Sequence, residues 1–77
     1  MQIDPLFRVH ILNETGIAKA RRIAAAFNDL LMVLNEVCVP GRERSLVYTK
    51  LEEAAFFAKK SMASQDENQV QYTPDSE

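Results

Sequence analysis

Apolar residues between positions 14 and 38 recur at steps of three and four, the spacing that places side chains on one face of an α-helix. We therefore predict a helix over residues 14–38, which Asn13 or Thr15 can cap, since both side chains can accept a hydrogen bond from a first-turn amide. Met32 and Val33 lie off this face, which indicates a helix buried on more than one side. The repeating positions are Ile17, Ala20, Ala24, Phe27, Leu31, Leu34 and Cys38.

A second apolar face follows residues 39–41, whose Val-Pro-Gly sequence ends the first helix. It predicts a helix over residues 42–64, and the short connection makes the two helices antiparallel neighbours. We therefore expect an all-α fold, an antiparallel helical hairpin. Phe56 and Phe57 lie outside the inward face of this second helix. That face consists of Val47, Leu51, Ala54, Ala55, Ala58 and Met62.

The two ends of the chain differ in character. Residues 1–12 are rich in apolar side chains but contain Asp4-Pro5, which disfavours a helix, so we expect an ordered arm that is extended or forms a single turn. Residues 65–77 are polar, acidic and without periodicity, which predicts a disordered or loosely attached tail. The expected organisation is one domain over residues 1–64, arm plus hairpin, followed by the tail over 65–77.

The length of the chain adds a constraint. A chain of 77 residues buries only about 60% of the surface that its unfolded form exposes, and small domains compensate with a disulfide, a metal or self-association. The single cysteine excludes an intrachain disulfide, and one cysteine with one histidine cannot supply the four ligands of a structural zinc site. Because the apolar faces also exceed what one hairpin covers, we expect a compact homo-oligomer.

Charge divides the chain in two. The net charge is −2, but residues 1–64 hold nine basic and seven acidic residues, whereas residues 65–77 hold four acidic residues and no basic one. A mildly cationic body suits a small anionic ligand or an ordinary solvated surface and is not basic enough for duplex DNA. No apolar run is long enough to cross a membrane, the first residues do not resemble a secretion signal, and a lone thiol suits a reducing cytoplasm.

No set of residues in the sequence predicts catalysis. His10 has no serine or cysteine partner near it in sequence, and Cys38 falls on the inward face of the first helix, where a thiol behaves as a small hydrophobe. Glu52 and Glu53 are consecutive, so they point about 100° apart on a helix and do not form an acid–base pair. We therefore expect a binding protein rather than an enzyme, with no metal and no cofactor.

Cations gather near the start of each predicted helix. Lys19, Arg21 and Arg22 occupy the first turns of the first helix, where cations oppose the helix dipole. Either an anionic ligand compensates them, or Glu14 and the acidic residues of another subunit do. A second group, next to Glu43, is better explained by a surface ion network, and it consists of Arg42, Arg44 and Lys50.

The arm combines the flat rings of Phe7 and His10 with the guanidinium of Arg8. Aromatic and guanidinium planes can stack on nucleobases, and each stacked base contributes about 1–3 kcal/mol. The simpler alternative is that Phe7 fills the groove of the hairpin and that local hydrogen bonds satisfy His10. Taken by themselves, the residues favour that alternative.

Residues 41–58, GRERSLVYTKLEEAAFFA, are the most specific stretch of the chain. They resemble the pattern R-E-x-S-L-A-x-T-K-L-E-x-A-x-F/M-W-A of a helical-hairpin domain shared by two phage anti-defence families, the anti-CBASS sponges for cyclic oligonucleotides and the Thoeris anti-defence sponges. Val47 and Phe57 stand where that pattern has alanine and tryptophan. Residues 3–8, IDPLFR, are similar to the start of the anti-CBASS family, and this chain has no room for the additional domain of the Thoeris family.

The resemblance implies a hexamer of helical hairpins acting in the cytoplasm of the infected bacterial host. It implies binding, without cleavage, of cyclic dinucleotides such as cGAMP between protomers and of cyclic trinucleotides in separate pockets. The arm has no tyrosine, so Phe7 or His10 takes the place of the family's arm aromatic. The family's dinucleotide site also uses a lysine of the first helix, which by position is Lys19. The expected dinucleotide site comprises Phe7, Arg8, His10, Lys19 and Arg22, and the expected trinucleotide site comprises the motif residues Arg42, Ser45 and Thr49.

Two other functions stay open at this point. One is a small helical regulatory protein that acts through protein or RNA contacts, which a dimer rather than a hexamer would favour. The other is a sponge for the cyclic ADP-ribose-type signals of Thoeris defence. Tight binding of an intact cyclic nucleotide, released unchanged on heating, separates a sponge from a regulatory protein and from an enzyme.

Overall fold

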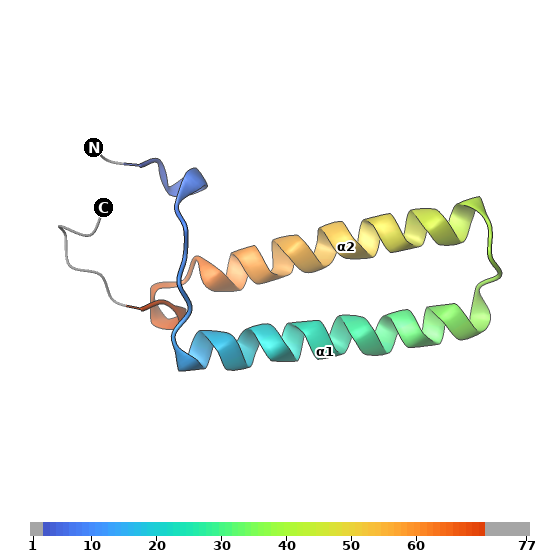
Figure 1. Cartoon of the computed structure of the whole chain (residues 1–77), viewed down its shortest axis with the longest axis horizontal. Helices are drawn as coiled ribbons and strands as arrows, with labels where there is room; N and C mark the ends of the chain where they lie inside the picture. The colour runs from blue at the N-terminus through green and yellow to red at the C-terminus, as the bar shows by residue number, and fades with distance from the viewer. Residues whose placement is uncertain (1–2, 71–77) are drawn as a thin grey trace.

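The computed structural model describes residues 3–70, and its main feature is a pair of long antiparallel helices (Figure 1). The elements are the 3-10 helix η1 (Pro5–Phe7), helix α1 (Glu14–Val37), helix α2 (Arg42–Ala63) and the 3-10 helix η2 (Asp66–Asn68). The molecule is long and flat, extending 52 × 24 × 11 Å along its principal axes. The predicted all-α hairpin is confirmed, and η1 is the single turn expected in the arm.

Local sequence explains where the helices begin and end. Oδ1 of Asn13 accepts a hydrogen bond of 2.8 Å from the amide of Gly16, so Asn13 is the cap of α1. At the other end, the amide of Cys38 still donates to the carbonyl of Leu34 before the chain turns away. Gly41 has a φ of +156°, a conformation that residues with side chains rarely adopt, which accounts for a glycine directly before α2.

The residues through which α1 and α2 contact each other recur every three or four positions, but this contact buries little apolar surface. Met62 is the one buried hydrophobic residue of the described chain, at 8% exposed. The predicted inward face of α1 is correct from Phe27 onward, but nearer the start Ile23 is half-buried while Ile17 and Ala24 are exposed, because α1 also packs against η2 there. The other half-buried apolar positions of the hairpin are Ala20, Phe27, Leu31 and Leu34 on α1 and Val47, Leu51, Ala55, Ala58 and Ala63 on α2.

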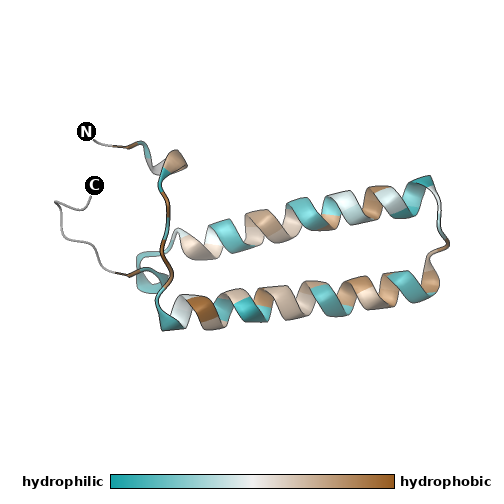
Figure 2. Ribbon diagram, in the orientation of Figure 1, coloured by the Kyte–Doolittle hydropathy of each residue, from teal (hydrophilic) through white to brown (hydrophobic). Residues whose placement is uncertain are grey.

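Much apolar surface therefore remains exposed, and Figure 2 shows hydrophobic residues in the arm and along both helices. Phe56 and Phe57 are 60% and 61% exposed, and their rings meet edge to face with centroids 5.3 Å apart. Met32 and Val33, which fall off the inward face in the sequence pattern, are exposed as well. A single hairpin leaves these side chains without a covering partner among the described residues.

The segment after α2 folds back onto the arm. The arm and this segment form an isolated antiparallel bridge between Leu12 and Gln69. Two backbone hydrogen bonds flank the bridge, from the amide of Val70 to the carbonyl of Ile11 at 2.8 Å and from the amide of Asn13 to the carbonyl of Asn68 at 3.0 Å. The arm is therefore paired with a stretch of chain whose sequence lacks the alternation of apolar and polar residues that is typical of a strand.

Asn68 is the centre of this C-terminal segment, which we define as residues 65–70. Its side chain is fully buried, and its Nδ2 donates to the carbonyl of Met62 at 2.9 Å and to Oε1 of Gln65 at 3.0 Å. The prediction of a disordered tail is therefore wrong for residues 65–70, and residues 71–77 lie outside the described part of the chain. The segment is held by hydrogen bonds rather than by apolar burial, which is why hydrophobic periodicity does not detect it.

Gly16 is required by the close approach of this segment to α1. A Cβ atom on residue 16 would collide with the carbonyl oxygen of Asn68 and approach Cδ2 of Leu12 to 3.0 Å. We expect Gly16→Ala to lower the free energy of unfolding by about 1–3 kcal/mol, although alanine favours a helix over glycine by about 1 kcal/mol. Urea denaturation checks this, with Ala18→Gly at an exposed α1 position as the control for helix propensity. A Gly16→Ala protein as stable as the parent would contradict the close approach.

Candidate functional site

The arm passes the end of α2 (Figure 1). Residues of the arm and of α2, with Ala20 of α1, line an open hollow of about 410 Å³ there, which we call the arm hollow. None of the described residues that line it is acidic. Phe7 is 73% exposed, so it borders this hollow instead of filling the groove between the helices. The charged and aromatic residues around the hollow are Phe7, Arg8 and His10 from the arm and Phe56, Lys59 and Lys60 from α2.

The C-terminal segment holds the arm residues in place. Nε2 of Gln69 lies 3.1 Å from Nδ1 of His10 and also donates to the carbonyl of Ala63 at 2.8 Å. The side chain of Asn13 donates to the carbonyls of Glu67 and Gln69 at 2.9 and 3.1 Å. The expectation that hydrogen bonds satisfy His10 agrees with this geometry, and its partner comes from a segment expected to be disordered.

Lys19 and Arg22 lie in a neighbouring hollow of about 400 Å³, the helix hollow, which they line with Ile23, Ala26 and Met62. The five residues expected to bind a cyclic dinucleotide thus divide between the arm hollow and the helix hollow, and Met62 lines both. Both hollows lie toward the end of the hairpin that is away from its turn, and Met62 is the residue that they share.

Lys19 has a carboxylate partner in the structure. Its Nζ lies 3.7 Å from Oε1 of Glu67, with the two side chains 40% and 70% exposed. The sequence left Glu14 or another subunit as the source of compensation, but the carboxylate comes from η2 of the same chain. An ion pair this exposed contributes at most about 1 kcal/mol, so an anionic ligand could displace it.

The residues expected to bind a cyclic trinucleotide lie near the other end of the hairpin, at the start of α2. Arg42, Ser45 and Thr49 are exposed and are spaced by three and four residues, so they share one face of the helix. Oγ1 of Thr49 donates to the carbonyl of Ser45 at 3.2 Å. The structure therefore keeps this set together and separates it from the arm by nearly the length of α2 (Figure 1).

Arg44 joins the two helices instead of forming the surface ion network expected with Glu43. Its Nη2 donates to Oδ1 of Asn35 at 3.1 Å and to the hydroxyl of Tyr48 at 2.9 Å, and its guanidinium carbon lies 5.5 Å from the centre of the Tyr48 ring. Tyr48 in turn donates to Asn35. The sequence indicates no such connection because Asn35 and Arg44 lie on different helices.

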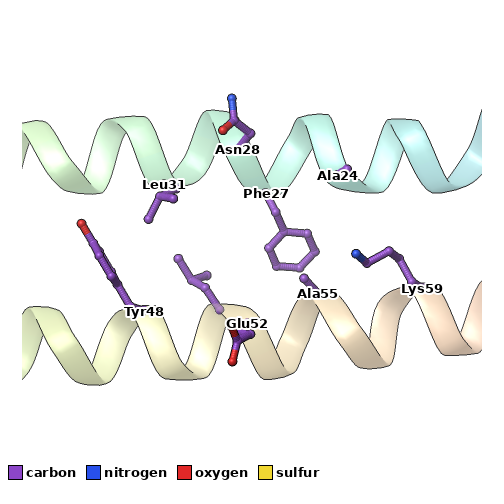
Figure 3. Close-up of a pocket in the computed structure, with 9 residues that line it drawn as sticks. Ala24, Phe27, Asn28, Leu31, Tyr48, Glu52, Ala55 and Lys59 are labelled. Carbon is purple, nitrogen blue, oxygen red and sulfur yellow. The ribbon is translucent and has the colours of Figure 1, made fainter.

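A groove runs along the hairpin between the helices (Figure 3). Phe27, Leu31 and Tyr48 lie between α1 and α2, whereas Asn28 points away, and the ammonium end of Lys59 extends over the same gap. Apolar side chains dominate this groove, so it belongs to the packing of the hairpin. Lys59 borders both this groove and the arm hollow.

Three lining residues of the arm hollow, Phe56, Lys59 and Lys60, are not among the expected site residues, although the sequence carries one signal for the two lysines. Neither lysine has an acidic residue three or four positions away on α2, so no helical ion pair neutralises it.

Among residues 3–70, no group of three or more His, Cys, Asp and Glu side chains could hold a metal ion. Within the same residues, no helix is long and apolar enough to span a membrane.

Comparison with known proteins identifies the family of this hairpin. No curated protein and no solved structure matches the chain. The family model described as Acb2/Tad1, hairpin domain, matches residues 1–63, which include the arm, α1 and α2. This match covers most of the chain and agrees with the resemblance carried by residues 41–58. The chain therefore belongs to the Acb2/Tad1 hairpin-domain family.

Proposed function

We propose that the protein binds cyclic oligonucleotide second messengers and sequesters them without cleaving them, which blocks activation of CBASS effectors. Membership of the Acb2/Tad1 hairpin family indicates a phage anti-defence role. The observation that carries the choice of ligand is the arm hollow, where aromatic rings and basic side chains meet and no described lining residue is acidic. The place of action is the cytoplasm of the infected host, where these messengers reach their effectors.

A cyclic dinucleotide matches the hollows in its chemistry, since it carries two phosphates and two bases. Bases stack on aromatic and guanidinium planes, which Phe7, His10 and Arg8 supply. Phosphates take charge-assisted hydrogen bonds from Lys19 and Arg22 in the helix hollow. Cyclic trinucleotides bind at the second site, at the start of α2, where Arg42, Ser45 and Thr49 share a face.

The proposal includes a homo-oligomer, with a hexamer as the expected size. Its support is the exposed apolar surface, including Phe56, Phe57 and Met32, which is uncommon on a monomer of this size. Assembly would bring arms and helices of different subunits together around one ligand. Light scattering checks the size, and a stable monomer at micromolar concentration would contradict it.

The test of the proposed function is binding followed by recovery. We expect calorimetry to detect tight binding of 3′,3′-cGAMP, and the ligand released by heating the complex to be chemically unchanged on chromatography. A linear product in stoichiometric or greater amount would identify an enzyme. Binding only of cyclic ADP-ribose-type compounds would identify a Thoeris-directed sponge, and no binding of any of these ligands would favour a protein or RNA partner.

A further inference from the structure

Lys59 and Lys60 stand out among the lysines of the described chain. Lys19 is paired with Glu67 at 3.7 Å and Lys50 with Glu53 at 3.9 Å. Within residues 3–70, the side chains of Lys59 and Lys60 make neither a hydrogen bond nor an ion pair. Within the described residues, no carboxylate therefore neutralises these two adjacent lysines.

Lys59 and Lys60 lie at the end of α2 that the arm passes. Both lysines line the arm hollow, opposite Phe7 and His10. Lys60 also borders a second hollow beside the arm, which Ser61 and Ser64 line. Lys59 instead extends toward the interhelical groove, which it also lines (Figure 3).

An anion that enters the arm hollow could bind the ammonium groups of Lys59 and Lys60 without first breaking an ion pair. It displaces no carboxylate from Lys59 or Lys60, whereas at Lys19 it has to displace Glu67. The ring of Phe56, one turn before Lys60 on α2, lines the same hollow and offers a flat surface next to the ammonium groups. The hollow therefore combines phosphate-binding and base-stacking groups on α2 as well as on the arm.

We propose that Lys59 and Lys60 bind one phosphate of the nucleotide ligand in the arm hollow, with Phe56 beside them as a stacking surface. This inference rests on the proposed function and deepens it, because it adds a second phosphate contact to that of Lys19. The ligand class it requires is a nucleotide with two separated phosphodiesters. A linear nucleotide with one phosphate would use only one of the two contacts.

The test compares lysine variants by calorimetry with 3′,3′-cGAMP. We expect Lys59→Gln and Lys60→Gln each to weaken binding, and the double variant to weaken it by at least about tenfold, as expected for loss of a charge-assisted bond. Lys50→Gln, which removes the same charge from α2 away from the arm, is the matched control and should stay within about twofold of the parent. The double substitution of Lys59 and Lys60 by arginine keeps the charge and should keep most of the affinity.

The outcomes separate this inference from the proposed function. If the parent protein binds 3′,3′-cGAMP and the double glutamine variant binds equally well, the inference is wrong and the proposed function stands. A loss for Lys50→Gln as large as for Lys60→Gln would also overturn it, since the effect would then be one of total charge. If the parent binds no cyclic dinucleotide, this inference and the dinucleotide part of the proposed function are both wrong. Helix content by circular dichroism and particle size by light scattering confirm that each variant is folded and assembled.

Discussion

A chain that ends at Ser64 is expected to unfold at a clearly lower temperature than a chain that ends at Val70. The shorter chain loses the backbone pairing of the arm with residues 68–70 and exposes the surface that Asn68 covers. Five hydrogen bonds join residues 67–70 to residues 10–13. At about 0.5–1.5 kcal/mol each, their loss amounts to about 3 kcal/mol or more. For a domain of this size such a loss lowers the melting temperature by about 10 °C or more.

The chain that ends at Val70 is the appropriate comparator because it keeps every contact described for the C-terminal segment. Both chains should be measured at equal concentration, because the melting temperature of an oligomer depends on it. The shorter chain should also lose ligand affinity, since Gln69 no longer holds His10. Equal melting temperatures would show that residues 65–70 are as expendable as a disordered tail.

Lys19→Glu is expected to reduce the affinity for a cyclic dinucleotide at least about tenfold, because a charge-assisted hydrogen bond contributes about 1.5–3 kcal/mol. Position 19 lies away from the contact between α1 and α2, so helix content and oligomer size should persist. If Arg42, Ser45 and Thr49 form a separate pocket, cyclic trinucleotide affinity should not change. Calorimetry with both ligands measures the two effects in one protein.

Glu67→Gln is the control that the ion pair makes possible. If Lys19 contacts a phosphate, removing the competing carboxylate should leave dinucleotide affinity unchanged or higher. If Lys19 serves only to hold η2 through Glu67, then Glu67→Gln should reduce affinity as Lys19→Glu does. Equal losses for the two variants would therefore exclude a direct contact between Lys19 and the ligand.

Much of the hairpin could be predicted because its determinants are local. The spacing of apolar residues and the cap at Asn13 predict α1, and Pro40-Gly41 predicts where the chain reverses. Both helices end within one residue of the predicted boundaries. Near the start of α1, Ile23 is half-buried and Ala24 is exposed, a difference that the spacing of apolar residues alone does not determine.

The candidate site could be predicted only in part because it joins distant segments. Phe7, Arg8 and His10 could be identified as base-stacking and cationic groups from the arm alone. Their neighbours on α2, Lys59 and Lys60, lie about 50 residues away in sequence, and only the folded hairpin brings them to the arm. Asn68 could not be identified because a polar residue in an acidic stretch is the usual sign of disorder.

The closure of the arm by residues 67–69 has a consequence for the order of folding. The hairpin can form from contacts near its turn, whereas the hydrogen bonds that hold the arm join residues 54 to 59 positions apart. Such long-range contacts are costly to form before the intervening chain is ordered and become easy once α1 and α2 lie side by side. We therefore expect the arm to dock last. During synthesis, we expect a nascent chain to form the arm hollow only after Gln69 has left the ribosome.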